Sequence, residues 1–313
     1  MKAMRVHALG AAPSLDEIDP PAAAPGRSLV EMHAATVGHI DRTVWGGHFL
    51  QHPPLPYVPG VEGAGVVRTS GRFAVGARVW MRGGGLGIRS DGTWRELVDA
   101  PDEALGLLPD QVPMTLGSAF FSPCTSAWVA LHEVARLQPG EQVLVTGAGG
   151  AVGGVAVQLA LAMGARVHAV VRDEAQAERL PAGVRMLPAD GLEAAAARVA
   201  VDVLVDTVGG ALLPAALRCV ARGGRAVLVG YAGGHSVSLD LPELLQRDVA
   251  LLPLNMLRRD AAGRAAAPEL LERLSDGRLQ LEVTPFALHE AGAALAWITQ
   301  RGHRGRAVLV PSA

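Results

Sequence analysis

The sequence predicts an α/β protein in which a doubly wound parallel sheet is joined to a smaller, barrel-like β domain. Three observations support this class. From Glu141 onward, strand-like and helix-like segments alternate along the chain. A glycine-rich turn separates the first strand of that region from its first helix. Before residue 117 the strand-like runs are short and are separated by Gly and Pro residues, which is typical of a small β domain.

The glycine-rich turn has the context of a dinucleotide-binding unit. A short β-branched run at 142–146 precedes it, an apolar helical stretch at 155–163 follows, and a second strand is predicted at 166–171. Its glycines are Gly147, Gly149, Gly150 and Gly153. A Cβ here would keep a diphosphate away from the backbone, and the free N–H groups of a helix start favour anions. We therefore expect a bound dinucleotide; the alternative is a purely structural turn.

Composition excludes several other classes of protein. The formal net charge of −2 argues against a nucleic-acid partner. Cys124 and Cys219 lie far apart, which excludes a disulfide framework and a four-cysteine zinc site. No apolar run approaches the roughly twenty residues of a membrane helix, and no signal peptide is visible. We expect a cytoplasmic protein with no nucleic-acid or membrane partner.

In the first part of the chain we expect strands at 5–9, 28–34, 77–81 and 93–98. Two proline-rich loops interrupt them, around residues 20–25 and 53–59, and residues 114–137 have helical length and composition. The second part is expected to supply six parallel strands, of which the last four lie at 185–187, 201–206, 223–230 and 249–254. Helices are expected at 191–200, 212–220, 265–274 and 290–300. A final strand at 306–310 has no slot in that sheet, so we expect it to return to the first domain.

Several longer motifs resemble the medium-chain dehydrogenase/reductase superfamily, and most closely its zinc-independent, quinone oxidoreductase-like branch. They are Pro-Tyr-Val-Pro-Gly-Val-Glu-Gly-Ala-Gly-Val-Val at 56–67, Gly-Thr-Trp-Arg-Glu-Leu-Val at 92–98 and Leu-Gln-Pro-Gly-Glu-Gln-Val-Leu-Val at 137–145. The resemblance covers nearly the whole chain. It implies a GroES-like β-barrel catalytic domain at 1–117 and 256–313, and a Rossmann dinucleotide-binding domain at 118–255.

The resemblance also bears on zinc. Zinc-dependent relatives carry a cysteine and a histidine where this chain has Gly38 and Val61, and only Cys124 of the three expected ligand positions remains. A catalytic zinc needs three protein ligands, so we expect no metal. His39 and Glu62 leave a metal site open as an alternative. In the metal-free interpretation, which we prefer, Cys124 is a buried apolar residue near the substrate pocket.

The end of the second predicted strand indicates which dinucleotide binds. NAD sites place an acidic residue there, but this chain has Val171 followed by Arg172, whose guanidinium suits a 2′-phosphate. Asp173 lies beside Arg172 and weakens the distinction between NADPH and NADH. Gln176 stands where related reductases often have Lys. We expect NADPH rather than NADH. The residues expected to bind it are Thr146, Gly147, Gly149, Gly150, Ala151, Val152, Gly153, Arg172, Val208, Gly230, Tyr231 and Asn255.

The resemblance places the catalytic residues in the Gly-His-Ile-Asp-Arg-Thr segment at 38–43. Asp41 is the acidic residue of that motif and either organises the loop or takes part in the chemistry. Thr43 stands where relatives often carry Tyr, and His39 could substitute for the Asn that is replaced by Gly38. The expected substrate pocket is formed by Trp45, His48, Phe49 and Cys124.

We therefore expect an NADPH-dependent, zinc-free oxidoreductase that transfers hydride to a quinone or an α,β-unsaturated carbonyl compound. The alternatives are a zinc-type alcohol dehydrogenase and a non-catalytic NADPH-binding redox sensor. A homodimer is also expected, because the family often dimerises through the sixth strand and residues 249–254 are apolar.

Overall fold

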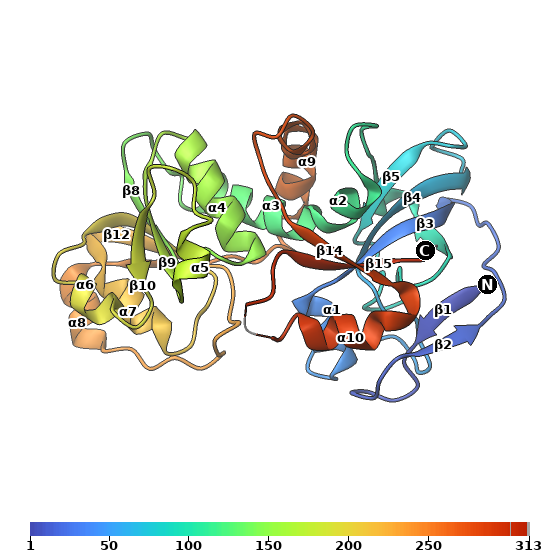
Figure 1. The fold of residues 1–313 in the computed structure, drawn as a ribbon, viewed down its shortest axis with the longest axis horizontal. Coiled ribbons are helices and arrows are strands. Elements are labelled where there is room, and N and C mark those ends of the chain that lie inside the picture. Colours follow the sequence, from blue (N-terminus) through green and yellow to red (C-terminus); the bar gives the residue numbers. More distant parts are fainter. Residues whose placement is uncertain (301, 312–313) are drawn as a thin grey trace. The chain divides into compact units, whose positions relative to one another are not determined.

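The computed structural model of the chain describes residues 1–300 and 302–311 (Figure 1). It divides into two compact units. Unit 1 comprises Met1–Phe121 and Leu271–Ala313, and unit 2 comprises Ser122–Leu270. The first boundary between the units lies a few residues after the predicted one at residue 117. The second lies well after the predicted one at residue 255, because the long helix α9 (Asp260–Ser275) crosses it. No helix among the described residues has the length and apolar character needed to span a membrane.

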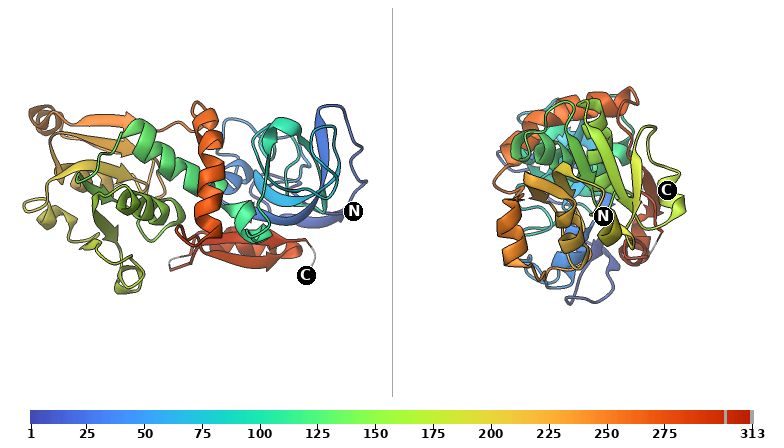
Figure 2. Two further views of the ribbon diagram at one scale, coloured as in Figure 1. Left: turned by 90° about the horizontal axis from the view of Figure 1, so that it is seen from above. Right: turned by 90° about the vertical axis from the view of Figure 1, so that its left-hand side faces the viewer.

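Unit 2 is a doubly wound parallel sheet, as predicted. Its six strands run in the order β10-β9-β8-β11-β12-β13, and every pairing between them is parallel. Figures 1 and 2 show the strands and helices of this unit in green to orange. The strands are β8 (Gln142–Val145), β9 (Arg166–Val171), β10 (Arg185–Pro188), β11 (Val201–Asp206), β12 (Val220–Leu228) and β13 (Ala250–Pro253). The Val and Leu residues of the central strands β8, β9 and β11 are buried, which is why these strands read as continuous apolar segments in the sequence.

The connecting segments of unit 2 are mainly helical. They are α3 (Phe121–Val129), a π-helix η2 (Ala130–Val134), α4 (Ala151–Ala162), α5 (Glu174–Ala177), α6 (Leu192–Ala195), α7 (Leu212–Arg218) and α8 (Leu241–Arg247). The helix predicted at 191–200 is much shorter than expected, since the regular helix α6 ends at Ala195. Helices α5 and α8 were not predicted. Strand β13 has one neighbour and is an edge of the sheet, so dimerisation through it stays a prediction, which the mass of the protein in solution would test.

Unit 1 is built around a seven-stranded sheet, to which the late strands β14 and β15 belong. The order is β14-β15-β3-β4-β5-β7, and β6 also pairs with β3. The strands are β3 (Arg27–Val37), β4 (Glu62–Thr69), β5 (Arg78–Arg82), β6 (Leu97–Pro101), β7 (Leu105–Leu107), β14 (Val283–Ala287) and β15 (Arg306–Val310). The predicted return of the last strand is confirmed, because β15 pairs antiparallel with β3.

Shorter elements complete unit 1. They are the antiparallel pair β1 (Lys2–Arg5) and β2 (Ser14–Glu17), helices α1 (His39–Trp45), α2 (Met114–Ala119) and α10 (Ala291–Trp297), and the 3-10 turns η1 (Asp102–Ala104) and η3 (Leu288–Glu290). The strand predicted at 5–9 is wrong in position, since regular pairing ends at Arg5. The strand predicted at 93–98 begins only at Leu97, because Thr93 and Trp94 donate their backbone N–H groups to the loop at Pro59 and Gly60.

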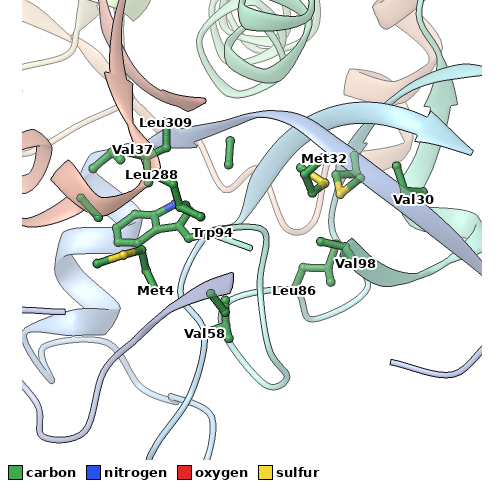
Figure 3. Packing of buried hydrophobic residues seen from close by; sticks show 14 of the residues in the cluster. Met4, Val30, Met32, Val37, Val58, Leu86, Trp94, Val98, Leu288 and Leu309 are labelled. Carbon is green, nitrogen blue, oxygen red and sulfur yellow. The ribbon is translucent and has the colours of Figure 1, made fainter. Parts of the chain in front are cut away.

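The core of unit 1 surrounds Trp94, which is fully buried. Figure 3 shows its indole beside Met4, Leu288 and Leu309, which come from the start, the late turn and the last strand of the chain. Its Nε1 donates to the Thr36 carbonyl at 2.9 Å, so the one polar atom of the ring is satisfied. Long-range contacts of this kind hold the terminal strands in the unit.

Candidate functional site

The glycine turn of unit 2 joins β8 to α4. Gly147 has a φ of 63° and Gly150 is the N-cap of α4 without a side-chain cap. The first amide of the helix that is hydrogen-bonded inside it is Gly154, which donates to Gly150 at 2.8 Å. The amides of Ala151, Val152 and Gly153 have no acceptor among the described residues, so three N–H groups at the positive end of the helix dipole can receive an anion.

A buried network fixes the strand ends beside this turn. The Thr146 hydroxyl donates to Asp206 Oδ1 at 2.5 Å, and Asp206 Oδ2 accepts the Gly209 amide at 2.8 Å. Thr146 Oγ1 also accepts the Thr207 amide at 3.0 Å. Burial raises the pKa of Asp206, although these hydrogen bonds oppose the shift. Thr146 is fully buried, so its hydroxyl holds β8 against β11 and is not presented to a ligand. Asp206 was not assigned from the sequence, although an acidic residue closing an apolar strand was visible.

The remaining residues predicted to bind the cofactor gather along one edge of the sheet. Val208 follows β11, Gly230 and Tyr231 follow β12, and Asn255 follows β13. Because β8, β11, β12 and β13 are neighbouring parallel strands, all these positions lie at their carboxyl ends, where open α/β sheets bind ligands. Tyr231 is 63% exposed. The Asn255 side chain accepts the amide of Leu257 at 3.0 Å and so stabilises its own turn.

Arg172 follows β9 at the same edge and is exposed, with no ion pair among residues 1–300 and 302–311. Asp173 is the N-cap of α5, where its Oδ1 accepts the Gln176 amide at 2.9 Å. The Gln176 side chain is buried against the glycine turn and accepts the Arg172 amide at 3.1 Å. Asp173 and Gln176 are therefore engaged in local structure, and Arg172 is the side chain of this segment that is available to a ligand.

The predicted catalytic segment of unit 1 is organised by Asp41. Its Oδ2 accepts the Gly38 amide at 2.7 Å, and its Oδ1 accepts the Val61 amide at 2.9 Å. One carboxylate thus joins the two backbone positions that were compared with zinc ligands. Asp41 is only 2% exposed, which favours its role in organising the loop over direct contact with a substrate.

A buried ion pair adjoins this carboxylate. Arg306 Nη2 lies 2.7 Å from Glu62 Oε2, and the two side chains are 11% and 1% exposed. Arg82 Nε is 3.7 Å from the other Glu62 oxygen. A Cβ built on Gly38 would lie 3.1 Å from Arg306 Nη2, so the guanidinium covers this glycine. Arg306 was not assigned a role from the sequence, although a charged residue at the start of the otherwise apolar strand 306–310 was visible there.

The other predicted residues of unit 1 lie on α1 and in the loop after it. His39 and Thr43 are one helical turn apart, and Thr43 Oγ1 donates to the His39 carbonyl at 2.8 Å. Partial burial lowers the pKa of His39, and the positive charges of His303, Arg306 and Arg42 add to the effect. Trp45 Nε1 donates to the Ala11 carbonyl at 2.6 Å.

The predicted pocket residues differ in their exposure. His48 is exposed, and Phe49 packs on the apolar cluster formed around Tyr57. Cys124 belongs to unit 2 and is fully buried, so it offers no surface to a pocket. Within the described part of the chain, no three His, Cys, Asp or Glu side chains are grouped as metal ligands.

Asp41 should make folding stability depend on pH. Burial, followed by the repulsion of Glu62, raises the pKa of Asp41 from 3.8 to about 7. The folded state then binds a proton more tightly than the unfolded state. We expect the free energy of unfolding to fall as the pH rises from about 4 to about 7, by about 4 kcal/mol. Chemical denaturation of the wild type and Asp41→Asn across this range isolates the contribution. If the wild type instead became more stable relative to Asp41→Asn as the pH rises, the raised pKa of Asp41 would be contradicted.

Comparisons with known proteins agree with this architecture. Residues 24–110 match the family model of the alcohol dehydrogenase GroES-like domain, and residues 151–276 match that of zinc-binding dehydrogenases. The quinone oxidoreductase of Sus scrofa is 29% identical over 249 residues, 74% of each chain. A solved quinone oxidoreductase structure from Pseudomonas syringae pv. tomato DC3000 is 26% identical and covers 99% of both chains with a TM-score of 0.86.

A polypeptide of the phenolphthiocerol/phthiocerol polyketide synthase of Mycobacterium tuberculosis is 32% identical over 249 residues. The match covers 75% of this chain but 11% of the synthase polypeptide, so the chain spans about a tenth of that protein. Together, the GroES-like unit, the parallel sheet with its glycine turn and these relatives define an oxidoreductase. The chain belongs to the medium-chain dehydrogenase/reductase superfamily, among its quinone oxidoreductase-like members.

Proposed function

We propose that the chain is an NADPH-dependent, zinc-independent reductase that transfers hydride to a quinone or an α,β-unsaturated carbonyl compound. The observation that carries the proposal is the position of the Arg306 guanidinium. It lies 3.1 Å from where a Cβ of residue 38 would be, and it is paired with the buried Glu62. A cation therefore lies next to the position at which a zinc-dependent relative would carry its cysteine ligand.

The residues present do not fit a catalytic zinc. Such a site needs three protein ligands, and neither Gly38 nor Val61 has a donor atom in its side chain. Glu62 is engaged by Arg306, and Cys124 is fully buried in the other unit. Metal-assisted chemistry is therefore not part of the proposed mechanism.

The residues of unit 2 do fit a dinucleotide. The amides of 151–153 would hold its diphosphate, and Arg172 would hold the 2′-phosphate that distinguishes NADPH from NADH. Backbone groups after β11, β12 and β13 would orient the nicotinamide end. When bound, the nicotinamide supplies the hydride, while the chain supplies position and electrostatics.

Without a Lewis acid, a conjugated acceptor is the favoured substrate class, because its own π system spreads the incoming negative charge. His39 and Thr43 lie on one face of α1, and His39 is the candidate hydrogen-bond donor; the Thr43 hydroxyl would have to give up its bond to the His39 carbonyl to donate. The lowered pKa of His39 keeps its ring neutral near pH 7, so one ring nitrogen still carries a proton. Asp41 is assigned a positioning role, because both of its oxygens accept backbone amides.

The proposal is tested by following NADPH oxidation with a panel of quinones, enones and enoyl thioesters. Turnover of at least one class, in protein without bound zinc, is expected. Stoichiometric zinc with chelator-sensitive activity would instead favour an alcohol dehydrogenase. Tight NADPH binding without turnover on any compound would favour a redox sensor.

Arg172→Ala should weaken NADPH binding about tenfold, corresponding to roughly 1.4 kcal/mol, and leave NADH binding nearly unchanged. The reason is that its guanidinium is exposed at the end of β9 and has no competing ion pair within the described residues. Fluorescence titration with both dinucleotides measures the effect. Arg198→Ala, an exposed arginine elsewhere in unit 2, is the matched control. Equal losses for both dinucleotides would contradict the 2′-phosphate role.

A further inference from the structure

Unit 2 contains a cavity, open to solvent, that the proposed function does not use. It has a volume of about 580 Å³ and is formed by the end of η2, by β12 and β13, and by Arg259 ahead of α9. Its lining consists of Glu133, Val134, Ala135, Arg136, Arg225, Leu252, Pro253 and Arg259. None of these residues belongs to the glycine turn or to the segment around Arg172.

The chain bends sharply at one wall of this cavity. Residues 130–134 form a π-helix, closed by a 2.8 Å hydrogen bond from the Ala135 amide to the Ala130 carbonyl. Arg136 follows with a φ of 50°, the left-handed conformation in which glycine is usual at a helix end. A side chain at this position is strained relative to glycine, and π-turns and strained residues concentrate at functional sites. Residue 136 is therefore an arginine although its backbone conformation favours glycine.

Arg225 forms a rigid second wall. Its Nη1 and Nη2 donate to the two carboxylate oxygens of Glu141 at 2.9 and 2.7 Å, and its Nε donates to the Ala135 carbonyl at 2.5 Å. Nη2 also reaches the Arg136 carbonyl at 3.4 Å. Arg225 is thus neutralised by Glu141 and ties the strained turn to β12. It shapes the cavity but has little capacity left for a ligand.

Arg136 and Arg259 differ from Arg225 in having no ion-pair partner. Neither guanidinium makes a side-chain hydrogen bond or salt bridge to any residue in 1–300 or 302–311. Glu133 is the single carboxylate of the lining and is likewise unpaired within those ranges. With Arg225 balanced by Glu141, the lining keeps one excess positive charge and two guanidinium groups, which are well suited to bind oxyanions.

We propose that this cavity binds a small oxyanion, a phosphate or carboxylate group, between Arg136 and Arg259. The charge of Glu133 opposes the anion and limits its affinity. Leu252 and Pro253 provide an apolar wall for the remainder of the ligand. The cavity is a site separate from the dinucleotide turn, because the two share no residue.

Calorimetric titration of the full-length chain with inorganic phosphate and with citrate tests the site. Both anions are expected to bind the wild type, and their relative affinities distinguish a phosphate ligand from a carboxylate. Arg136→Gly should weaken binding at least tenfold while the melting temperature stays the same or rises, since glycine relieves the strained φ. Arg259→Ala should weaken binding similarly, and Glu133→Gln should strengthen it several-fold.

Arg222→Ala is the matched control, because Arg222 is an exposed arginine of β12 outside the cavity lining. It should leave both affinities within about twofold, as expected for a screened charge beyond the site. Failure of both anions to bind the wild type would overturn the proposal. So would equal affinities of the wild type and Arg136→Gly, since any binding would then lie elsewhere.

Discussion

Gly153→Ala is expected to weaken NADPH binding at least a hundredfold, about 2.7 kcal/mol, and to lower folding stability by about 1–3 kcal/mol. A Cβ at this position would lie 2.2 Å from the Gly147 carbonyl oxygen and 2.7 Å from its carbon. Both are backbone atoms of the turn, so no side chain can move aside. The turn must open, and the three amides that would hold the diphosphate then lose their common direction.

The matched control is Gly154→Ala in the same helix. There the added Cβ meets one atom, the Ala148 oxygen at 3.3 Å, and alanine favours helix by up to about 1 kcal/mol. We expect nearly unchanged stability and affinity. Titration with NADPH and chemical denaturation measure both variants. Equal behaviour of the two would show that the close approach of Gly153 to Gly147 does not control binding.

Arg306→Met is expected to lower the free energy of unfolding by about 3–5 kcal/mol, because it leaves a buried carboxylate without its nearest cation. Glu62 is 1% exposed, and the nitrogen of its second cation, Arg82 Nε, is 3.7 Å away rather than 2.7 Å. The same change removes positive charge beside Gly38, so the proposed reductase activity should fall with it.

Adding Glu62→Gln to Arg306→Met should restore much of the lost stability, since replacing both members of a buried pair removes the uncompensated charge. Urea denaturation of the single and double variants measures this coupling. Arg278→Met provides a surface control; its ion pairs with Glu272 and Asp276 are exposed, so little change is expected. A double variant as unstable as Arg306→Met alone would argue that Arg306 acts through packing rather than charge.

Much of unit 2 could be predicted because its signals are local. The strand at 142–145, the glycine turn and the helix after it follow one another within about twenty residues, and each has a pattern of its own. Buried parallel strands such as β11 read as continuous apolar runs whatever their neighbours are. The family resemblance, which the comparisons confirm, implied a Rossmann-type sheet, whereas the order of its six strands came from the structure.

Unit 1 was less predictable because its short strands depend on their partners. Strand β14 was missed: Pro285 interrupts its pattern and its residues are at most half-buried, yet it pairs along its whole length with β15. Helix α1 has only seven residues, too few to be stable alone, and is held by the Asp41 hydrogen bonds to Gly38 and Val61.

By itself, the sequence determined that this protein has a dinucleotide-type glycine turn, a doubly wound sheet and no metal-ligating side chain at positions 38 and 61. Only the tertiary structure decided which polar and charged side chains meet. Arg306 and Glu62 are 244 positions apart in the chain, and Asp206 and Thr146 are 60 apart. Such pairs leave no periodic signal, because periodicity reports which face of an element is buried, whereas the partner across the interior is set by how the strands pair.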